Sequence, residues 1–566
     1  MGGSALLELA DIDRAIAAGD PELGASIVRY LAQPDPEPGR PELDPSYEAD
    51  DDSAHDVDVP TGAFTSAKLR ETINRLGGAM TGTEKKLARR EVFAAAEASP
   101  FAPPRLRLGK RLVAMYERGT PADRAALLHV FAHGELKWGS WFAAKAIYKL
   151  AEARHDAALF GVLAYRFDVL RQQPTPEIKN PTKLYMRKRA WRYLRQLGRA
   201  VPEAYATFAI ETLRHYPESG VGDVWVAAHI VAHGAMSWAR DGVRFAVNDI
   251  AQRAYPEAWK LSPAPLLRLL EAAQNDLVCT FAILSLRGDH PLALRAVEPA
   301  WLALLGRRPL PAIHTFVVQL LRESPDFHQS KLRALGLHDV VLGFLRSGSV
   351  EARTYALEYA AAHAPDIAIA ELVSLVVEAA NDVRAFAAAR LEAMTPQQLG
   401  IANLCLLLDR PTAPWAAAKL AQGFTPRDLD VQTFVETALR GTALYNALVK
   451  FVNDKQSSIP AAYLTAFLDD PRSAAYQLRP IVAAMMTDLG KRSARDIGVA
   501  WIQRSLEDPQ RTQVVAKWLE AGMLAGSDLD VAWLQALVAK PRLRPIALRV
   551  LGDRRLVEPA RVGLAW

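Results

Sequence analysis

The sequence predicts an all-α fold, an elongated α-solenoid of stacked antiparallel helix pairs, on three observations. Apolar residues, mostly Ala and Leu, recur at helical spacing along nearly the whole chain. Pro or Gly interrupts these stretches at intervals of about 12–20 residues, and the alternating β-branched runs typical of strands are nearly absent. A large aromatic residue recurs every 29–39 residues in the second half. That period is the length of two helices and two short turns.

The recurring aromatic residues each stand near the expected start of an apolar helix, shortly after turn or capping residues. They are Phe281, Phe316, Tyr355, Phe386, Trp415, Tyr445 and Tyr476. One helix pair cannot bury its own apolar face, so we expect pairs to stack and the aromatic ring to fill the space between them. The strings SVEARTYAL (349–357) and NDVRAFAAA (381–389) resemble the second helix of HEAT or armadillo repeats. The resemblance covers roughly residues 260–550 and implies a fold without a biochemical role.

A second, upstream pattern is a duplicated motif. The string from His129 to Trp138 matches a second string, from His229 to Trp238, that lies 100 residues further along the chain. His133 and His233 occupy the same position in the two strings. The first half is therefore also expected to repeat. Three segments, AEARHDAALFGVLAYRFD (151–168), YMRKRAWRYLRQLGR (185–199) and YPEAWKLSPAPLLRLLEAA (255–273), resemble helical-repeat regions of large bacterial proteins that carry a WGR domain. No Trp-Gly-Arg triplet occurs in this chain.

Charge and composition divide the chain into four expected regions. Residues 1–34 form an N-terminal helical segment with a net charge of −3. Residues 35–64 form an acidic linker rich in Pro and Asp, with ten acidic residues and one Arg before position 59, and such composition predicts disorder. Residues 65–260 form a basic helical region, since 65–199 holds 27 Lys or Arg against 11 Asp or Glu. Residues 261–566 form the HEAT-like repeats.

Composition also excludes several classes of protein. The chain has 566 residues, of which 50 % are apolar and 23 % charged, as in an ordinary globular protein. No uncharged apolar run reaches the roughly 18 residues of a membrane span, and early acidic residues do not fit a signal peptide. Cys279 and Cys405 lie in apolar stretches and indicate buried thiols without a disulfide framework. We therefore expect a cytoplasmic protein with no membrane contact.

Candidate catalytic chemistry is sparse. His129 with His133, and His229 with His233, have the i, i+4 spacing of metal ligands on a helix, but no third ligand stands at a matching offset in both copies. Packed or capping histidines are the favoured interpretation, and a His-centred metal enzyme is the third alternative. Residues 488–493 (DLGKRS) resemble the end of a phosphate-binding loop, but Met485 stands where that loop needs Gly. No catalytic residue, cofactor or enzymatic activity is predicted.

The strongest functional lead is a basic helix from Lys179 to Arg199, with eight basic residues and no acidic residue. On a helical wheel with Leu184 at 0°, four cations fall within about 20–80° and six apolar or aromatic residues fall within about 180–340°. One face should pack and the other should carry cations. The candidate binding residues are Lys179, Lys183, Lys188, Arg189, Arg192, Arg195 and Arg199, with Arg105, Arg107, Lys110 and Arg111 upstream.

We expect a non-enzymatic scaffold that binds a macromolecular protein partner along the solenoid surface, within a larger bacterial assembly. The alternative is a nucleic-acid-binding protein that uses residues 65–199, because an unbalanced basic surface attracts the phosphates of nucleic acid. Two further interpretations stay open for this block: it binds an acidic protein surface, which includes the chain's own residues 35–58, or it is a solvated face without a ligand.

Overall fold

The computed structural model describes residues 6–33, 104–136, 138–172, 178, 180–218, 224–235, 249–409, 411–524 and 530–563. The described chain forms two compact units, Met1–Tyr359 and Ala360–Trp566. The linker expected at 35–64 lies outside the described residues. Helices on both sides of residue 260, where the sequence suggested a boundary, pack against one another within the first unit.

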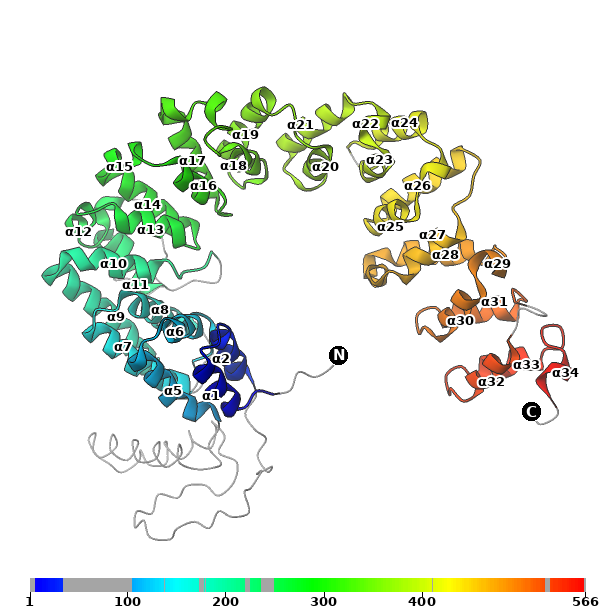
Figure 1. Cartoon of the computed structure of the whole chain (residues 1–566), viewed down its shortest axis with the longest axis horizontal. Coiled ribbons are helices and arrows are strands. Elements are labelled where there is room, and N and C mark those ends of the chain that lie inside the picture. Colours follow the sequence, from blue (N-terminus) through cyan, green and yellow to red (C-terminus); the bar gives the residue numbers. More distant parts are fainter. Residues whose placement is uncertain are drawn as a thin grey trace, which may run out of the picture. The chain divides into compact units, whose positions relative to one another are not determined.

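The first unit is a series of helices, most of which pack against their neighbours in the chain (Figure 1). Its α-helices are α1 (Leu9–Ala18), α2 (Leu23–Ala32), α5 (Pro104–Arg118), α6 (Pro121–His133), α7 (Trp138–Ala153), α8 (Ala157–Val169), α9 (Asn180–Ala200), α10 (Pro202–Leu213), α11 (Trp225–Ala232), α12 (Pro256–Lys260), α13 (Ala264–Ala272), α14 (Asp276–Asp289), α15 (Pro291–Arg295), α16 (Pro299–Gly306), α17 (Pro311–Glu323), α18 (His338–Gly343) and α19 (Val350–His363), in which the division between the units falls. Its short 3₁₀ helices are η1 (Leu170–Gln172), η2 (His233–Ala235), η3 (Ile250–Gln252), η4 (Pro325–Phe327), η5 (Gln329–Lys331) and η6 (Phe344–Arg346).

The second unit repeats this arrangement with shorter helices. Its α-helices are α20 (Ile369–Glu378), α21 (Asn381–Glu392), α22 (Pro396–Leu399), α23 (Ile401–Leu406), α24 (Ala413–Gly423), α25 (Val431–Leu439), α26 (Thr442–Asp454), α27 (Ala461–Asp469), α28 (Arg479–Leu489), α29 (Ala494–Ile497), α30 (Val499–Glu507), α31 (Thr512–Glu520), α32 (Val531–Val538), α33 (Arg544–Gly552) and α34 (Pro559–Val562), and its 3₁₀ helices are η7 (Pro426–Asp428), η8 (Pro471–Ala474) and η9 (Tyr476–Leu478). The described residues contain no β-strand. The predicted all-α fold of packed helix pairs is confirmed.

Most of the recurring aromatic residues fill the core between helices, as predicted. Four are buried and two are half-buried: Phe281, Phe316, Tyr355 and Tyr445, then Phe386 and Trp415. Tyr476 differs, because its side chain is 76 % exposed. It lies in η9, and α28 begins only at Arg479, whose guanidinium sits 4.6 Å from the Tyr476 ring centroid. The prediction of a core position is wrong for Tyr476.

Cationic side chains join neighbouring helices by donating to carbonyl groups at helix ends. Arg166 on α8 donates to the carbonyl oxygens of Ala132 at 3.0 Å and Gly134 at 2.7 Å, where α6 ends. Lys455 donates to the carbonyl oxygen of Ala421 at 2.9 Å, in the last turn of α24. The last four carbonyls of a helix lack intrahelical partners and carry the negative end of the helix dipole. These cations therefore stabilise the packing of neighbouring helices.

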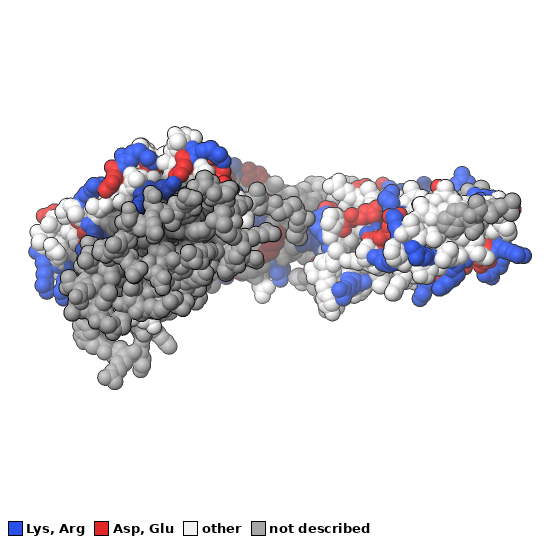
Figure 2. Space-filling model, turned by 90° about the horizontal axis from the view of Figure 1, so that it is seen from below, with Lys and Arg blue, Asp and Glu red and all other residues white. Residues whose placement is uncertain are grey.

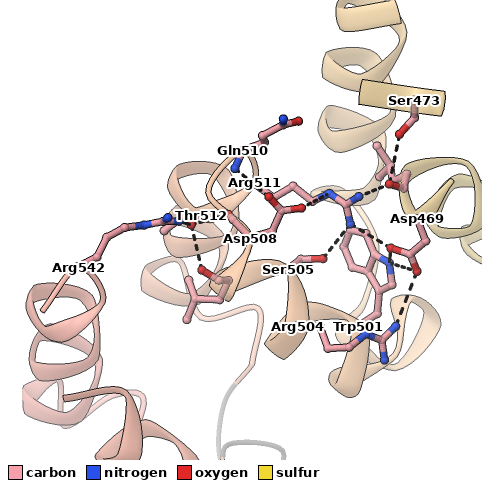
Figure 3. Close-up of polar contacts among 12 residues, drawn as sticks. Asp469, Ser473, Trp501, Arg504, Ser505, Asp508, Gln510, Arg511, Thr512 and Arg542 are labelled. Atoms are coloured by element: carbon pink, nitrogen blue, oxygen red, sulfur yellow. Dashed lines mark hydrogen bonds and ion pairs between the residues drawn. The ribbon is translucent and has the colours of Figure 1, made fainter. Parts of the chain in front are cut away.

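The second unit contains a larger example, centred on Arg511 (Figure 3). Its guanidinium lies 3.0 Å from the Asp469 carboxylate and 3.2 Å from that of Asp508, and it also donates to the carbonyl of Leu468. The same guanidinium lies 5.5 Å from the ring of Trp501, whose indole N–H donates to Asp469 at 3.1 Å. One arginine thus links the end of α27 to α30 and to the start of α31.

The backbones of α8 and α10 approach each other closely at Gly161. A β-carbon at this position would lie 2.3 Å from the carbonyl oxygen of Glu211, far inside van der Waals contact. Since that neighbour is backbone, the two helices would have to separate to admit a methyl group.

Gly161→Ala is therefore expected to destabilise the protein by about 1–3 kcal/mol, the usual cost of overpacking. The matched control is Gly343→Ala in α18, where no atom lies within 4 Å of the added β-carbon and the backbone is helical. The control should keep or slightly raise the thermal unfolding midpoint followed by far-UV circular dichroism, because Ala favours helix over Gly. Equal midpoints for the two variants would contradict the close approach.

Candidate functional site

Helix α9 has the two faces that its sequence predicts. Its buried apolar side chains are Met186, Ala190, Trp191, Leu194 and Leu197. They pack against α8, α10 and α11, which fixes the rotation of α9 about its own axis. The opposite face is consequently held toward solvent.

The exposed face carries a row of four cations, which we call the α9 stripe: Lys188, Arg192, Arg195 and Arg199. The residues recur at intervals of four, three and four, so the row follows one side of the helix for about 16 Å. Within the described part of the chain, none of these four side chains makes an ion pair or a hydrogen bond. Because α9 holds no acidic residue, the positive charges of the stripe are not balanced along the helix.

Many other cations of the described structure pair with acids. In the second unit, Arg472 lies 2.7 Å from Glu436, and Lys540 lies 2.7 Å from Glu507. Figure 2 shows one face of the molecule, on which basic and acidic side chains are interspersed over the second unit. The α9 stripe therefore differs in kind from these ordinary solvated surfaces.

Two residues predicted to bind lie elsewhere on α9. Lys183 is only 5 % exposed, so it does not belong to the exposed row. Arg189 is half-buried and donates to Glu152 on α7 at 3.1 Å, which raises the pKa of the guanidinium. The exposed set on α9 is thus smaller than the sequence suggested. Lys179 lies outside the described residues.

The upstream basic cluster is divided in a similar way. Arg111 on α5 makes a two-pronged ion pair with Asp13 on α1, with N···O distances of 2.5 and 2.7 Å. This contact lowers the pKa of the Asp13 carboxyl. Lys110 is exposed, while Arg105 and Arg107 lie in the first turn of α5, and their side chains are outside the described set. Arg111 therefore attaches the acidic N-terminal segment to the basic region.

Sequence reasoning missed two exposed residues beside the stripe. Leu184 and Tyr185 are 36 % and 48 % exposed, one turn before Lys188. The helical wheel contains the signal, because Tyr185 falls at about 100°, next to Arg192 at about 80°. An apolar and an aromatic side chain thus extend the cationic row at its N-terminal end.

A buried carboxylate, Asp168 at the end of α8, sets the position of α9. It accepts hydrogen bonds from Arg187 Nε at 2.8 Å, from the Tyr216 hydroxyl at 2.7 Å and from the Val226 N–H at 2.9 Å. Burial raises the pKa of Asp168, although Arg187 opposes this effect. The carboxylate connects α8 with α9, with the residues after α10 and with the first turn of α11.

Asp168→Ala should destabilise the first unit by about 3–5 kcal/mol, because the change leaves the Arg187 charge buried without its partner. The double variant Asp168→Ala/Arg187→Met should recover much of that loss in urea unfolding, since it removes both charges. Asp326→Ala, at an exposed aspartate, is the control and should remain within about 0.5 kcal/mol of wild type. A double variant no more stable than Asp168→Ala would show that the pair is not coupled.

The duplicated histidines form two close pairs. The ring centroids of His129 and His133 lie 4.7 Å apart, and the Nδ1 atoms of His229 and His233 lie 2.9 Å apart. His229 is fully buried and its ring stacks on Trp191 at 4.6 Å with an angle of 6°. Among the residues that the structure describes, no third His, Cys, Asp or Glu joins either pair in a metal-binding group. The geometry places His229 as a packing residue beneath α9.

Burial of His229 makes stability depend on pH. Burial lowers the pKa of His229 to about 3, with a further contribution from His233. Below pH 6.5 the unfolded chain binds a proton at this position, while the folded state does not until about pH 3. As the pH is lowered from 6.5 toward 3, the free energy of unfolding should therefore fall by up to about 1.4 kcal/mol per pH unit. His229→Gln should remove that part of the slope in urea unfolding at pH 4–7, and an unchanged slope would contradict the assignment.

The fold and this face together define a class of protein, an all-α protein of stacked helix pairs with a cationic helix face. Comparison with models of known protein families finds no match, and comparison with curated proteins finds none either. No helix within the described ranges combines the length and apolar character needed to cross a membrane.

Proposed function

We propose that this protein is a non-enzymatic helical scaffold that binds an anionic macromolecular partner through the α9 stripe. The observation that supports the proposal is the row of Lys188, Arg192, Arg195 and Arg199, which is exposed and without acidic partners among the described residues. Like charges at i, i+4 on a helix cost about 0.2–0.5 kcal/mol per pair. Attraction to a bound polyanion would offset that repulsion.

The rigidity of the helix supports binding rather than simple solvation. Asp168 and the apolar face hold α9 in place, so the four cations keep their spacing before a partner arrives. A preorganised surface loses less conformational entropy on binding than flexible side chains on a loop. The extended row also matches a ligand whose negative charges repeat along a line.

We favour nucleic acid as that ligand, because of the residue next to the row. Phosphates repeat along a strand and suit Lys188 through Arg199, while the exposed Tyr185 offers a ring on which an unpaired base can stack. Single-stranded nucleic acid uses both features. An acidic protein surface would use the charges but not require the ring.

The test measures binding of fluorescent oligonucleotides to the full chain by anisotropy. Four phosphate contacts predict that the logarithm of the affinity falls with the logarithm of salt concentration with a slope of about −2.8 for single strands, or about −3.6 for duplex. The variant Lys188→Glu/Arg192→Glu/Arg195→Glu/Arg199→Glu should abolish binding, and Tyr185→Ala should weaken single-strand binding selectively.

The matched control reverses four exposed cations elsewhere: Lys331→Glu/Arg427→Glu/Lys450→Glu/Arg554→Glu. It changes the net charge equally, so it should retain binding if the stripe is the site. Labelled polyglutamate serves as the acidic-protein probe. Binding of polyglutamate but not of oligonucleotides would replace nucleic acid with an acidic protein partner, and binding of neither at 50 mM salt would overturn the proposal.

A further inference from the structure

The second unit contains a cavity of about 400 Å³ where the chain leaves α28 and meets the end of α31. Its wall includes Gly490, Lys491, Arg492 and Ser493, which belong to the sequence segment that only partly resembles a phosphate-binding loop. Arg495 and Trp518 also line the cavity. A cavity of this size accommodates a small organic molecule.

The wall is positively charged. Lys491, Arg492 and Arg495 line it, and none of the described residues in its wall is Asp or Glu. Arg492 is held by Asp488, with an N···O distance of 2.9 Å, from the last turn of α28. Lys491 and Arg495 are exposed, and their side chains have no hydrogen-bond or ion-pair partner among the described residues. Two cations are thus left for a ligand after the internal pair is formed.

Asp496, the acidic residue that follows Arg495 in the sequence, already has a hydrogen-bond partner. Asp496 accepts a hydrogen bond from the Ser493 hydroxyl at 2.6 Å, and Ser493 in turn accepts from the Asp496 N–H at 3.2 Å. This reciprocal contact fixes the turn from Ser493 to Asp496, which carries Arg495. It also means that the Ser493 hydroxyl is not a donor to a ligand.

Trp518 adds a neutral donor at the same place. A β-carbon on residue 490 would lie 2.7 Å from the indole nitrogen of Trp518, so Gly490 allows the ring to approach the turn. No described residue accepts a hydrogen bond from this N–H. An indole N–H can only donate, and it suits an oxygen-rich anion.

We propose that this cavity binds a small phosphate-bearing molecule. Arg495 and Lys491 would contact the phosphate oxygens, since guanidinium and ammonium groups form strong charge-assisted hydrogen bonds with phosphate. The site differs from a phosphate-binding loop because side chains carry it: Met485 replaces the first glycine of that loop, and α29 spans only Ala494–Ile497. The proposal is independent of the α9 stripe.

Isothermal titration calorimetry of the full chain with AMP, inorganic phosphate and adenosine tests this site. AMP and phosphate should bind and adenosine should not, and a higher affinity for AMP than for phosphate would identify a phosphorylated organic molecule as the ligand class. Lys491→Gln and Arg495→Gln should each weaken phosphate binding about tenfold, the effect of one charge-assisted hydrogen bond. Trp518→Phe should weaken it less, because it removes only a neutral donor.

The control variant Lys450→Gln/Arg427→Gln, at exposed cations of the same unit, should bind like wild type. Thermal unfolding of Lys491→Gln and Arg495→Gln should match that of wild type, which separates lost binding from lost folding. No phosphate binding at millimolar concentration, or equal loss in the control, would overturn the proposal. The α9 charge-reversal variant should keep phosphate binding, so failure of one proposal does not decide the other.

Discussion

The arrangement of the first unit depends on the hydrogen bonds and the ion pair that the buried carboxylate of Asp168 forms. It lies in a fully buried position, where an unpaired charge would be strongly unfavourable, and it therefore needs every donor that it receives. Those donors come from α9, from Tyr216 and from the start of α11, so the helices can satisfy the charge only in one relative arrangement. Hydrophobic contact alone would allow α9 to slide or rotate more easily, because it is not directional. A buried ion pair thus sets which side of the basic helix reaches solvent.

Much of α9 could be predicted from sequence, because a helix has a fixed angular spacing. The wheel that placed four cations outside also places Lys183 at about 260°, within the apolar sector, and the structure buries it. That angle argues against Lys183 as a binding residue. The partner of Arg187 could not be predicted, since Asp168 stands 19 residues away on another helix. Tertiary packing decides which charged residues pair in the interior, and the pattern of a single sequence does not predict those pairs.

The same distinction explains the other outcomes. Tyr476 was expected in the core by spacing, but Pro480 stands two residues into the sequence of α28, and Pro favours the first turn of a helix. That local signal indicates that the helix starts after Tyr476. The cavity beside Gly490 could be predicted only in part. Its motif was visible in sequence, while the approach of Trp518 from 28 residues further along the chain was not. The sequence thus predicts local features such as helix starts, but it does not predict contacts between residues that are far apart in the chain.

The ion pair between Asp13 and Arg111 has a consequence for how the chain folds. The ion pairs between Arg287 and Glu323 and between Arg472 and Glu436 each join residues 36 positions apart, whereas this one joins residues 98 positions apart. Closing a longer loop costs more chain entropy, and folding slows as contacts become more distant in sequence. The helices between α5 and α19 can assemble from near neighbours before α1 and α2 arrive. We therefore expect the two N-terminal helices to pack last, onto a unit whose other helices are already in contact.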